Sequence, residues 1–565
     1  MQKLSQISLA CLVLMLPIFI LPAVTGDAAA QPTELWTHIT TLPGDCCQTF
    51  AIDPVNPDVL YAGTTSPDNG GVFMSSDGGQ NWQRLRGNLP SPLRVTAIAV
   101  APNTSDVFFV GSETGPNGTG VFLSTTGGNS WTNVTGNILS TVGNPSNSDI
   151  SAIAISPNYS HDHTAFLAIN YGKIGGRVFR TTDSASTWQT IGPEKGDYTN
   201  ITISPNYSQD HTVFFLGSSS PASSKSTDGG DTWQGLPSGV GGPIVFSPNY
   251  SQDHTLFSGG QLVYRSTDNG VSWTNTFNAA PDGAFVTISR SFITDHAVVA
   301  FVLNKGVFLS YGGTAPWTPI SEGLTDFCCG KIQFDGNQRL VVNTSHGLWR
   351  YTFSNLRLPS TPVTPSLPSA DINYFPETSH TLSFGFKYFW EHSGGLSVFG
   401  YPLTQEFKEA NSDNNKVYTV QYFERERYEY HPEFKGTPYE TELGRLGVLD
   451  AQQNDLLSTI PFQSVADNKD SNCAYFPTSH KVCGKFLTYW QLHGLDFGDP
   501  SVSYRESLAL FGYPISEQFT DPQTGFTVQY FERARLEYHP QYAGTTNEIE
   551  LGLLGKQTLQ SWGWQ

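Results

Sequence analysis

The sequence predicts a mainly β fold in which a long array of similar four-stranded units is followed by two small α+β modules. Charged residues make up only 14% of the 565-residue chain, whereas aromatic residues reach 13% and glycine is abundant. This composition is typical of many short strands joined by tight turns, and it disfavours helical bundles and disorder. Two different internal repeats, one before and one after residue 358, divide the chain.

Residues 1–30 have the features of an export signal. Lys3 is followed by an apolar run from Ile7 to Val24 and by three alanines at 28–30, which suit a cleavage site. No later stretch is apolar enough to span a bilayer, so no transmembrane segment is expected after signal removal. We therefore predict a protein that is secreted, extracellular or associated with the cell surface.

The charge and the cysteines narrow the class further. A formal charge of −19 disfavours nucleic acid as a partner, because no basic cluster is present to neutralise phosphates. Six cysteines remain when Cys11 in the signal is set aside, and an even number in an exported chain predicts disulfides. Cys473 and Cys483 are expected to close a short loop. No CxxC pair is present, so no metal site is expected.

An eight-residue pattern, S-x-D-x-G-x-x-W, dominates the first 350 residues. It recurs, complete or degenerate, at 75–82, 124–131, 181–188, 226–233, 266–273 and 310–317. Serine and aspartate side chains bond the amides of a turn, glycine tolerates a positive φ, and tryptophan begins the next strand. We therefore assign a structural role in a stapled hairpin to Asp77, Trp82, Trp131, Asp183, Trp188, Asp228, Trp233, Asp268 and Trp273.

This pattern resembles the Asp-box, or BNR repeat, of sialidases, sortilin, xyloglucanases and photosystem II assembly factors. In those families the box marks the turn between the last two strands of a β-propeller blade. A strand such as Gly120–Ser124 precedes most copies here, and the spacing of about 40 to 57 residues suits a four-stranded blade. The resemblance, together with our count of the units, implies a seven-bladed propeller over residues 33–357.

The first strand of the array is predicted to close the ring. Trp36–Pro43 is similar to the fourth strand of a unit, and the seventh unit lacks that strand. The N-terminal strand would complete the last blade and minimise exposed edges. Cys46-Cys47 and Cys328-Cys329 would then lie on neighbouring strands, which predicts crosslinks between the two pairs. Vicinal disulfides within each pair are the alternative.

A second motif, SPNYSQDHT, recurs at 156–164, 204–212 and 247–255, with a divergent copy at 289–297. Its Asp-His pair suits a metal site or a proton relay, but a reactive centre is normally unique. We predict instead a turn between the first two strands of a unit, shaped by Pro and Asn and bonded by Asp or Ser. The scaffold therefore includes His163, His211, His254 and His296.

A segment rich in Pro, Ser and Thr, 358–372, is predicted to be an extended linker. Beyond it, two copies of a new repeat occupy 373–452 (module 1) and 473–565 (module 2). Both copies contain FGYP, TVQYFER and EYHP, followed by a Leu-Gly pair. The repeat resembles LGFP-type repeats, and more fully the tandem modules of exported proteins from filamentous bacteria such as Chloroflexi. That resemblance implies association with the cell envelope.

Each module is expected to contain a helix, at 384–392 and 486–493, and a β-hairpin, at 417–431 and 526–539. Acidic side chains and histidines gather on the hairpins, where paired carboxylates could serve acid–base chemistry. Because arginines interleave with them, we expect cross-strand ion pairs at a rim. This cluster comprises Glu424, Glu426, Glu429 and His431, with Glu532, Glu537 and His539 in the second copy.

Four aromatic residues of the modules have two open interpretations. Trp390, Tyr401, Trp490 and Tyr513 either pack in the module cores or stack on the sugar rings of an envelope polysaccharide.

The overall prediction is an exported, non-catalytic binding or scaffold protein, expected to be a monomer. The propeller would be a platform for an unknown protein or polysaccharide partner at the cell surface, and the modules would hold the chain at the envelope. No catalytic, cofactor-binding or metal residue is assigned, and no cofactor is expected.

The alternative is a glycoside hydrolase, sialidase- or xyloglucanase-like, with its site in the propeller funnel. The sialidase arginine motif and a second propeller are both absent. An assembly factor with a basic docking patch is a third candidate, which the charge disfavours.

Overall fold

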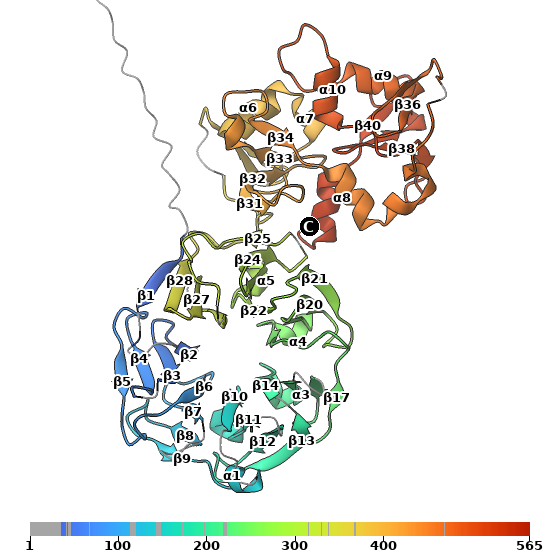
Figure 1. Ribbon diagram of the computed structural model, residues 1–565. Coiled ribbons are helices and arrows are strands. Elements are labelled where there is room, and N and C mark those ends of the chain that lie inside the picture. The colour runs from blue at the N-terminus through green and yellow to red at the C-terminus, as the bar shows by residue number, and fades with distance from the viewer. Residues whose placement is uncertain are drawn as a thin grey trace, which may run out of the picture.

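The structure, a computed structural model, describes residues 35–565 except 41, 43–46, 67, 114–119, 143–147, 172–174, 197, 218–222, 315, 329, 337, 366–368 and 468. The described chain forms a ring of β-sheets with a smaller α+β part beside it (Figure 1). The mainly β class is therefore confirmed. No helix in the described residues is long and apolar enough to cross a membrane.

Seven four-stranded antiparallel sheets lie between Thr37 and Thr352 in the described part of the chain. They comprise β2 (Cys47–Ile52), β3 (Leu60–Thr64), β4 (Val72–Ser75) and β5 (Gln83–Leu85); β6 (Val95–Val100), β7 (Phe108–Ser112), β8 (Val121–Ser124) and β9 (Thr132–Asn133); β10 (Asp149–Ile155), β11 (Ala165–Asn170), β12 (Gly176–Thr181) and β13 (Gln189–Gly196); β14 (Tyr198–Ile203), β15 (Val213–Gly217), β16 (Ser224–Ser226) and β17 (Gln234–Gly235); β18 (Ile244–Phe246), β19 (Leu256–Ser258), β20 (Leu262–Ser266) and β21 (Thr274–Asn278); β22 (Ala284–Ile288), β23 (Ala297–Val302), β24 (Gly306–Tyr311) and β25 (Thr318–Pro319); and β26 (Ile332–Phe334), β27 (Arg339–Thr344) and β28 (Gly347–Thr352) with β1 (Thr37–Thr40).

The sheets follow one another around a central opening, which is the arrangement of a β-propeller (Figure 1). β1 pairs antiparallel with β28, so the first described strand lies in one sheet with the last three strands of the ring. The second strand of each sheet is buried on both faces; every residue of β15 and of β23 is buried. The sequences of these strands are almost continuously apolar because neighbouring sheets cover both of their faces.

Four-residue helices fill the connection between the first and second strands of four consecutive sheets. They are α2 (Tyr159–Asp162), α3 (Tyr207–Asp210), α4 (Tyr250–Asp253) and α5 (Phe292–Asp295), and a further short helix, α1 (Ile138–Thr141), follows β9. Each of the four coincides with one copy of the SPNYSQDHT motif.

The α+β part contains two copies of one arrangement, a two-stranded hairpin, helices and a four-stranded sheet. Module 1 comprises β29 (Ile372–Phe375), β30 (His380–Ser383), α6 (Phe384–His392), α7 (Gly395–Phe399), β31 (Phe407–Ala410), β32 (Val417–Tyr422), β33 (Arg427–Tyr430), η2 (Pro432–Phe434), β34 (Thr441–Leu443) and α8 (Leu446–Gln453), and η3 (Leu456–Ser458) and η4 (Ile460–Phe462) follow. Module 2 comprises β35 (Cys473–Tyr475), β36 (Lys481–Cys483), α9 (Gly484–Leu492), α10 (Tyr504–Phe511), β37 (Phe519–Thr520), β38 (Thr527–Tyr530), β39 (Arg535–Tyr538), η5 (Pro540–Tyr542), β40 (Ile549–Leu551) and α11 (Leu554–Ser561).

Several local predictions are confirmed. Helix α6 spans 384–392 as expected, α9 overlaps the second expected helix, and β32–β33 and β38–β39 are the expected hairpins. Cys473 and Cys483 are joined by a disulfide across the β35–β36 pair. The export signal lies outside the described residues. Within the segment expected to be a linker, Leu358 is buried and the Pro359 carbonyl accepts a hydrogen bond from the Gln405 amide at 2.9 Å.

The terminal helix of each module packs on the other module. The Val448 amide of α8 donates to the Glu532 carbonyl at 3.1 Å, and the Lys556 amide of α11 donates to the Glu424 carbonyl at 3.0 Å. Ala451 of α8 belongs to a cluster with module 2 residues, whereas Leu559 of α11 belongs to one with module 1 residues. The two modules therefore form one interlocked unit with a shared core.

Candidate functional site

The box motif is a hydrogen-bonded staple in the structure. The Ser75 hydroxyl donates to Asp77 Oδ1 at 2.7 Å and accepts from the Gly79 amide at 2.7 Å, and Asp77 Oδ1 also accepts from the Asn81 amide at 2.9 Å. These hydrogen bonds from Asn81 lower the pKa of the Asp77 carboxyl to about 2. The Trp82 indole donates to the Gly79 carbonyl at 3.0 Å. The carboxylate is thus engaged by its own turn.

Corresponding bonds recur in the other boxes. The carboxylates of Asp183, Asp228 and Asp268 each accept from the amide four residues later. In the copy that lacks aspartate, the Thr126 hydroxyl oxygen accepts from the Ser130 amide at 3.0 Å. The tryptophans Trp131 and Trp188 are buried, and the indoles of Trp233 and Trp273 donate to carbonyls of their own turns.

The Asp-His motif is a turn that is bonded to the neighbouring staple. Asp210 Oδ2 accepts from the Ser204 hydroxyl at 2.7 Å, and its Oδ1 accepts from the Thr212 amide at 2.8 Å. His211 adopts a left-handed conformation, φ 48°, and its carbonyl accepts from the Gly229 amide of the box at 3.0 Å. The left-handed histidine recurs at His163, His254 and His296. These bonds confirm the structural turn that the sequence predicts.

A Ser-His-Asp grouping at the ring was missed by sequence reasoning. Asp326 Oδ2 accepts from the Ser345 hydroxyl at 2.5 Å and lies 2.8 Å from His346 Nδ1. A catalytic serine would instead bond the outer ring nitrogen of the histidine. Burial alone would raise the pKa of Asp326, but the hydrogen bonds from Ser345 and His346 outweigh it and lower that pKa. The grouping therefore holds a loop and lacks the geometry of a triad.

The cysteines of the predicted seam are only partly described. Cys328 is exposed, and its amide donates to Asp326 Oδ1 at 3.0 Å. Cys46, Cys329 and the side chain of Cys47 lie outside the described residues. The crosslinks between the two cysteine pairs, and the vicinal alternative, both stay predictions.

Of the four aromatic residues considered for sugar stacking, Trp490 belongs to the shared core, and Trp390 and Tyr513 pack against that core. The Trp390 indole donates to the Gly400 carbonyl at 3.1 Å, and its ring contacts Phe375, which also contacts Tyr401. Trp490 is 3% exposed and contacts Phe476, which also contacts the half-buried Tyr513. The FGYP tyrosines are positioned by their backbone: the amides of Tyr401 and Tyr513 donate to Glu424 and Glu532.

The arginine–glutamate pairs of the hairpins are buried, so the expected rim position is wrong. Arg427 lies 2.7 Å from Glu409 and pairs with Glu429, and none of the three is more than 6% exposed. Burial raises the pKa of Glu409 to about 7, although Arg427 opposes that shift. Tyr311 of the ring and Trp564 near the C-terminus line a small cavity together with Glu409.

In module 2 the corresponding carboxylate comes from module 1. Arg535 pairs with Glu537 at 2.5 Å and lies 3.4 Å from Asp450 of α8. The Tyr530 hydroxyl donates to Asp450 at 2.7 Å. The carboxylates of Glu429, Glu537 and Asp450 are therefore engaged in ion pairs with buried arginines.

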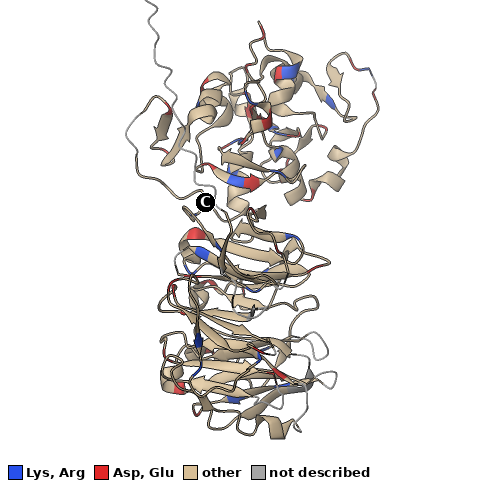
Figure 2. Ribbon diagram, turned by 60° about the vertical axis from the view of Figure 1, so that its left-hand side comes forward, with Lys and Arg blue, Asp and Glu red and all other residues tan. Residues whose placement is uncertain are grey.

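The modules contact the ring at its most degenerate box, residues 310–317. The Thr314 hydroxyl donates to the Trp562 carbonyl at 3.0 Å, and the Ala410 amide donates to the Thr318 hydroxyl at 3.2 Å. The rings of Tyr311 and Trp564 meet edge to face at 5.6 Å. Charged residues are thinly spread over the ring (Figure 2). No group of His, Cys, Asp or Glu that could hold a metal occurs among the residues that the structure describes.

No family model and no curated protein matches the chain. Among solved structures, a GH74 enzyme of Niastella koreensis has a TM-score of 0.43 and 17% identity over 70% of this chain and 66% of its own. A GH74 xyloglucanase from Xanthomonas campestris has a TM-score of 0.43 and 14% identity, with 69% and 59% covered. YCF48 bound to a D1 peptide has a TM-score of 0.41 and 16% identity, with 57% and 97% covered. The chain thus spans less than two thirds of both GH74 structures, and similarity at this level assigns no site.

Proposed function

We propose that the protein is an exported, non-catalytic scaffold of the bacterial cell surface, with the ring as the platform for a protein or polysaccharide partner. The supporting observation is that the repeated Asp, Ser and His residues of the ring are engaged in its own turns. Asp77 is held by Asn81 and Ser75, and Asp210 by Ser204 and Thr212. Carboxylates engaged in this way stabilise the turns and are poor general acids at neutral pH.

The finer architecture is part of the proposal. We interpret the seven sheets as the blades of a seven-bladed Asp-box propeller over residues 33–357. The pairing of β1 with β28 supports closure by the N-terminal strand. Trp36 supports it further, because its indole donates to the Ile320 carbonyl at 2.6 Å and ties the chain start to the neighbouring sheet. Crosslinks between Cys46-Cys47 and Cys328-Cys329 would hold the same seam.

The modules, 373–452 and 473–565, are proposed to associate with the cell envelope. Their contact with the ring supports a fixed mounting, because Thr314 and Tyr311 of the ring meet Trp562 and Trp564 of the tail. A partner on the ring would therefore be held in a defined orientation to whatever the modules bind.

The test is co-sedimentation of the full chain, without its signal, with purified bacterial envelope fractions. Reducing-sugar release from xyloglucan and from sialylated glycans is measured in parallel. We expect saturable association with at least one envelope fraction and no sugar release, and Asp77→Asn and His211→Asn should leave the association unchanged. Turnover of either glycan would overturn the non-catalytic assignment, and failure to associate with any fraction would overturn the envelope role.

A further inference from the structure

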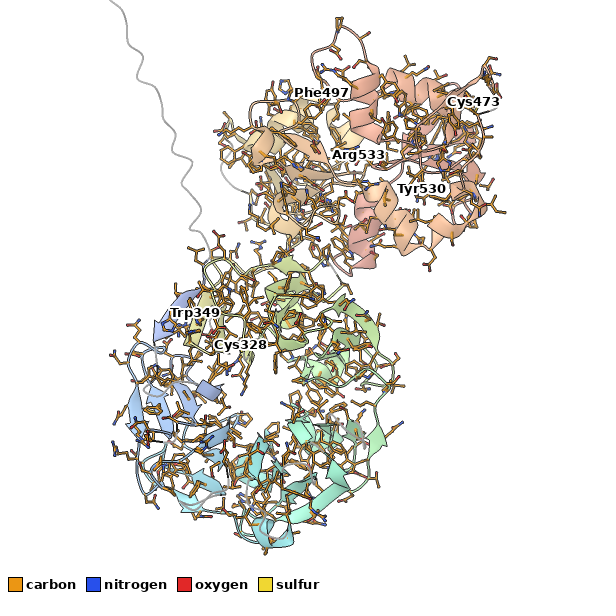
Figure 3. The ribbon with its side chains drawn as sticks, viewed as in Figure 1. Cys328, Trp349, Cys473, Phe497, Tyr530 and Arg533 are labelled. Atoms are coloured by element: carbon orange, nitrogen blue, oxygen red, sulfur yellow. A yellow bond between two sulfur atoms is a disulfide. The ribbon has the colours of Figure 1, made fainter. Side chains whose placement is uncertain are left out.

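A groove of about 230 Å³ opens on module 2, lined by the first turn of α9 and by three neighbouring strands. Thr527, Tyr538 and Ile549 are register partners on β38, β39 and β40, so they form a row across one face of the sheet. Lys485 and Phe486 of α9 and the side chain of Gln518 complete the lining. Cys483 also lines the groove, and its disulfide partner Cys473 lies at the end of the module away from the ring (Figure 3).

The walls of the groove are fixed before any ligand arrives. The Gln518 side-chain amide donates to the Cys483 carbonyl at 3.0 Å, and Cys483 is tied to Cys473 by the disulfide. Phe486 and Ile549 are 3% and 6% exposed, so the floor is anchored in the core. A preformed concave site loses little conformational freedom on binding.

The equivalent row of module 1 differs from this one at its end. There the equivalent row is Thr419, Tyr430 and Thr441, and the Lys408 ammonium donates to the Thr419 hydroxyl at 2.8 Å. Lys408 pairs with Thr419 as Thr520 pairs with Thr527. The corresponding residue of module 2, Thr520, has no ammonium group to bond the Thr527 hydroxyl.

The chemistry of the lining selects the ligand class. An aromatic ring, a hydroxyl and an amide surround an apolar floor, and the Lys485 ammonium lies 4.9 Å from the centroid of the Tyr538 ring. Lys485 is paired with Glu548, so the rim offers both donors and acceptors without net charge. The formal charge of −19 on the chain also repels acidic polymers. The volume is below the roughly 300–1,000 Å³ of drug-sized pockets, which suits a single ring-sized unit.

We propose that this groove binds one pyranose unit of a neutral polysaccharide. The ring hydroxyls would bond Gln518, Thr527 and the Lys485–Glu548 pair, and the C–H face would lie on the apolar floor. This inference rests on the proposed envelope association and assigns a place and a ligand class to it. A single sugar ring predicts weak binding, with a Kd of about 1 mM.

The test uses saturation-transfer NMR on the full chain, with neutral gluco-, manno- and galacto-hexaoses and an acidic hexagalacturonate as probes. Thr520→Lys copies the residue of module 1 and fills the end of the row, and Lys408→Thr is the matched control in module 1. We expect at least one neutral hexaose to bind, at least tenfold loss of that binding in Thr520→Lys, and no loss in Lys408→Thr. Thermal melting verifies that both variants fold.

The outcomes separate this inference from the envelope role. Undiminished neutral-sugar binding in a folded Thr520→Lys, preference for the acidic probe, or no binding of any neutral hexaose would each overturn the groove assignment. If the chain still co-sediments with envelope in those cases, the envelope role stands and the groove assignment alone fails. If co-sedimentation is also absent, both fail.

Discussion

Glu426 is a buried acid whose replacement should stabilise the protein at neutral pH. It lies in the turn between β32 and β33, it is fully buried, and neither carboxylate oxygen has a hydrogen-bond partner among the described residues. Burial raises the pKa of Glu426 well above its ordinary value of 4.5, and the attraction of Arg533 and Arg425 offsets this only in part. The equivalent position in module 2 is Ala534, which is also buried.

The magnitude follows from proton linkage. The folded protein keeps a proton on Glu426 that the unfolded chain releases above pH 4.5, so stability falls as pH rises above that value. The cost grows by about 1.36 kcal/mol per pH unit and reaches at most about 3.4 kcal/mol at pH 7. Glu426→Ala removes this cost but loses about 1–2 kcal/mol of packing. We expect a gain of about 1–2 kcal/mol at pH 7 and a loss of similar size at pH 4.5.

The measurement is hydrogen exchange of the 417–430 peptide at the two pH values, corrected for intrinsic exchange rates, because a chain of several parts does not unfold in one step. Glu426→Gln, which keeps the shape of the side chain, should raise the stability at pH 7 and leave it nearly unchanged at pH 4.5. Ala534→Glu, the reverse change in module 2, should destabilise increasingly as pH rises. Equal destabilisation by Glu426→Ala at both pH values would show that the acid is ionised and paired, and the reasoning would be refuted.

Three further predictions test the scaffold. His211→Val should destabilise the ring by about 1–2 kcal/mol because a β-branched residue is strained at φ 48°, whereas His211→Asn should be nearly neutral; thermal melting compares them. The pKa of Asp77 is lowered to about 2, so its contribution to stability is present above about pH 4 and is lost as pH falls toward 2; acid titration of Asp77→Asn should show a weaker loss. Gly447→Val, a change in module 1, places a side chain against the Phe531 carbonyl oxygen of module 2, so the amide hydrogen exchange of module 2 should become faster. Unchanged protection of the β38 amides would contradict the interlocked packing.

The parts of the fold that the sequence predicted are those whose chemistry is local. A box such as Ser75–Trp82 carries its hydroxyl, carboxylate, glycines and indole within eight residues, and the structure bonds them to each other. The same holds for the turn around Asp210 and for the Cys473–Cys483 pair. A motif that satisfies its own hydrogen bonds can be recognised without knowing what surrounds it.

The interlocked modules depend on partners that the sequence does not specify. TVQYFER is identical in both copies, so its letters cannot show that helix α8 packs on the second copy and α11 on the first. The Leu-Gly pair near the end of each module, Leu446-Gly447 and Leu554-Gly555, was the available signal. A side chain at Gly447 would overlap the Phe531 carbonyl oxygen, and one at Gly555 would overlap the Phe423 carbonyl oxygen. Glycine is needed there because a helix crosses the backbone of the opposite module.

The divergence of one box has a physical reason in the structure. Residues 310–317 keep Ser310 and Trp317 but have Gly312 where most boxes have aspartate and Thr314 where most have glycine. Elsewhere the aspartate holds the turn from within, whereas here the turn is held from outside, because Thr314 donates to the Trp562 carbonyl. Because the Trp562 carbonyl accepts a hydrogen bond from this turn, the hydrogen bonds to an aspartate within the box are no longer required. In this chain the box that departs furthest from the pattern is therefore the one on which the modules dock.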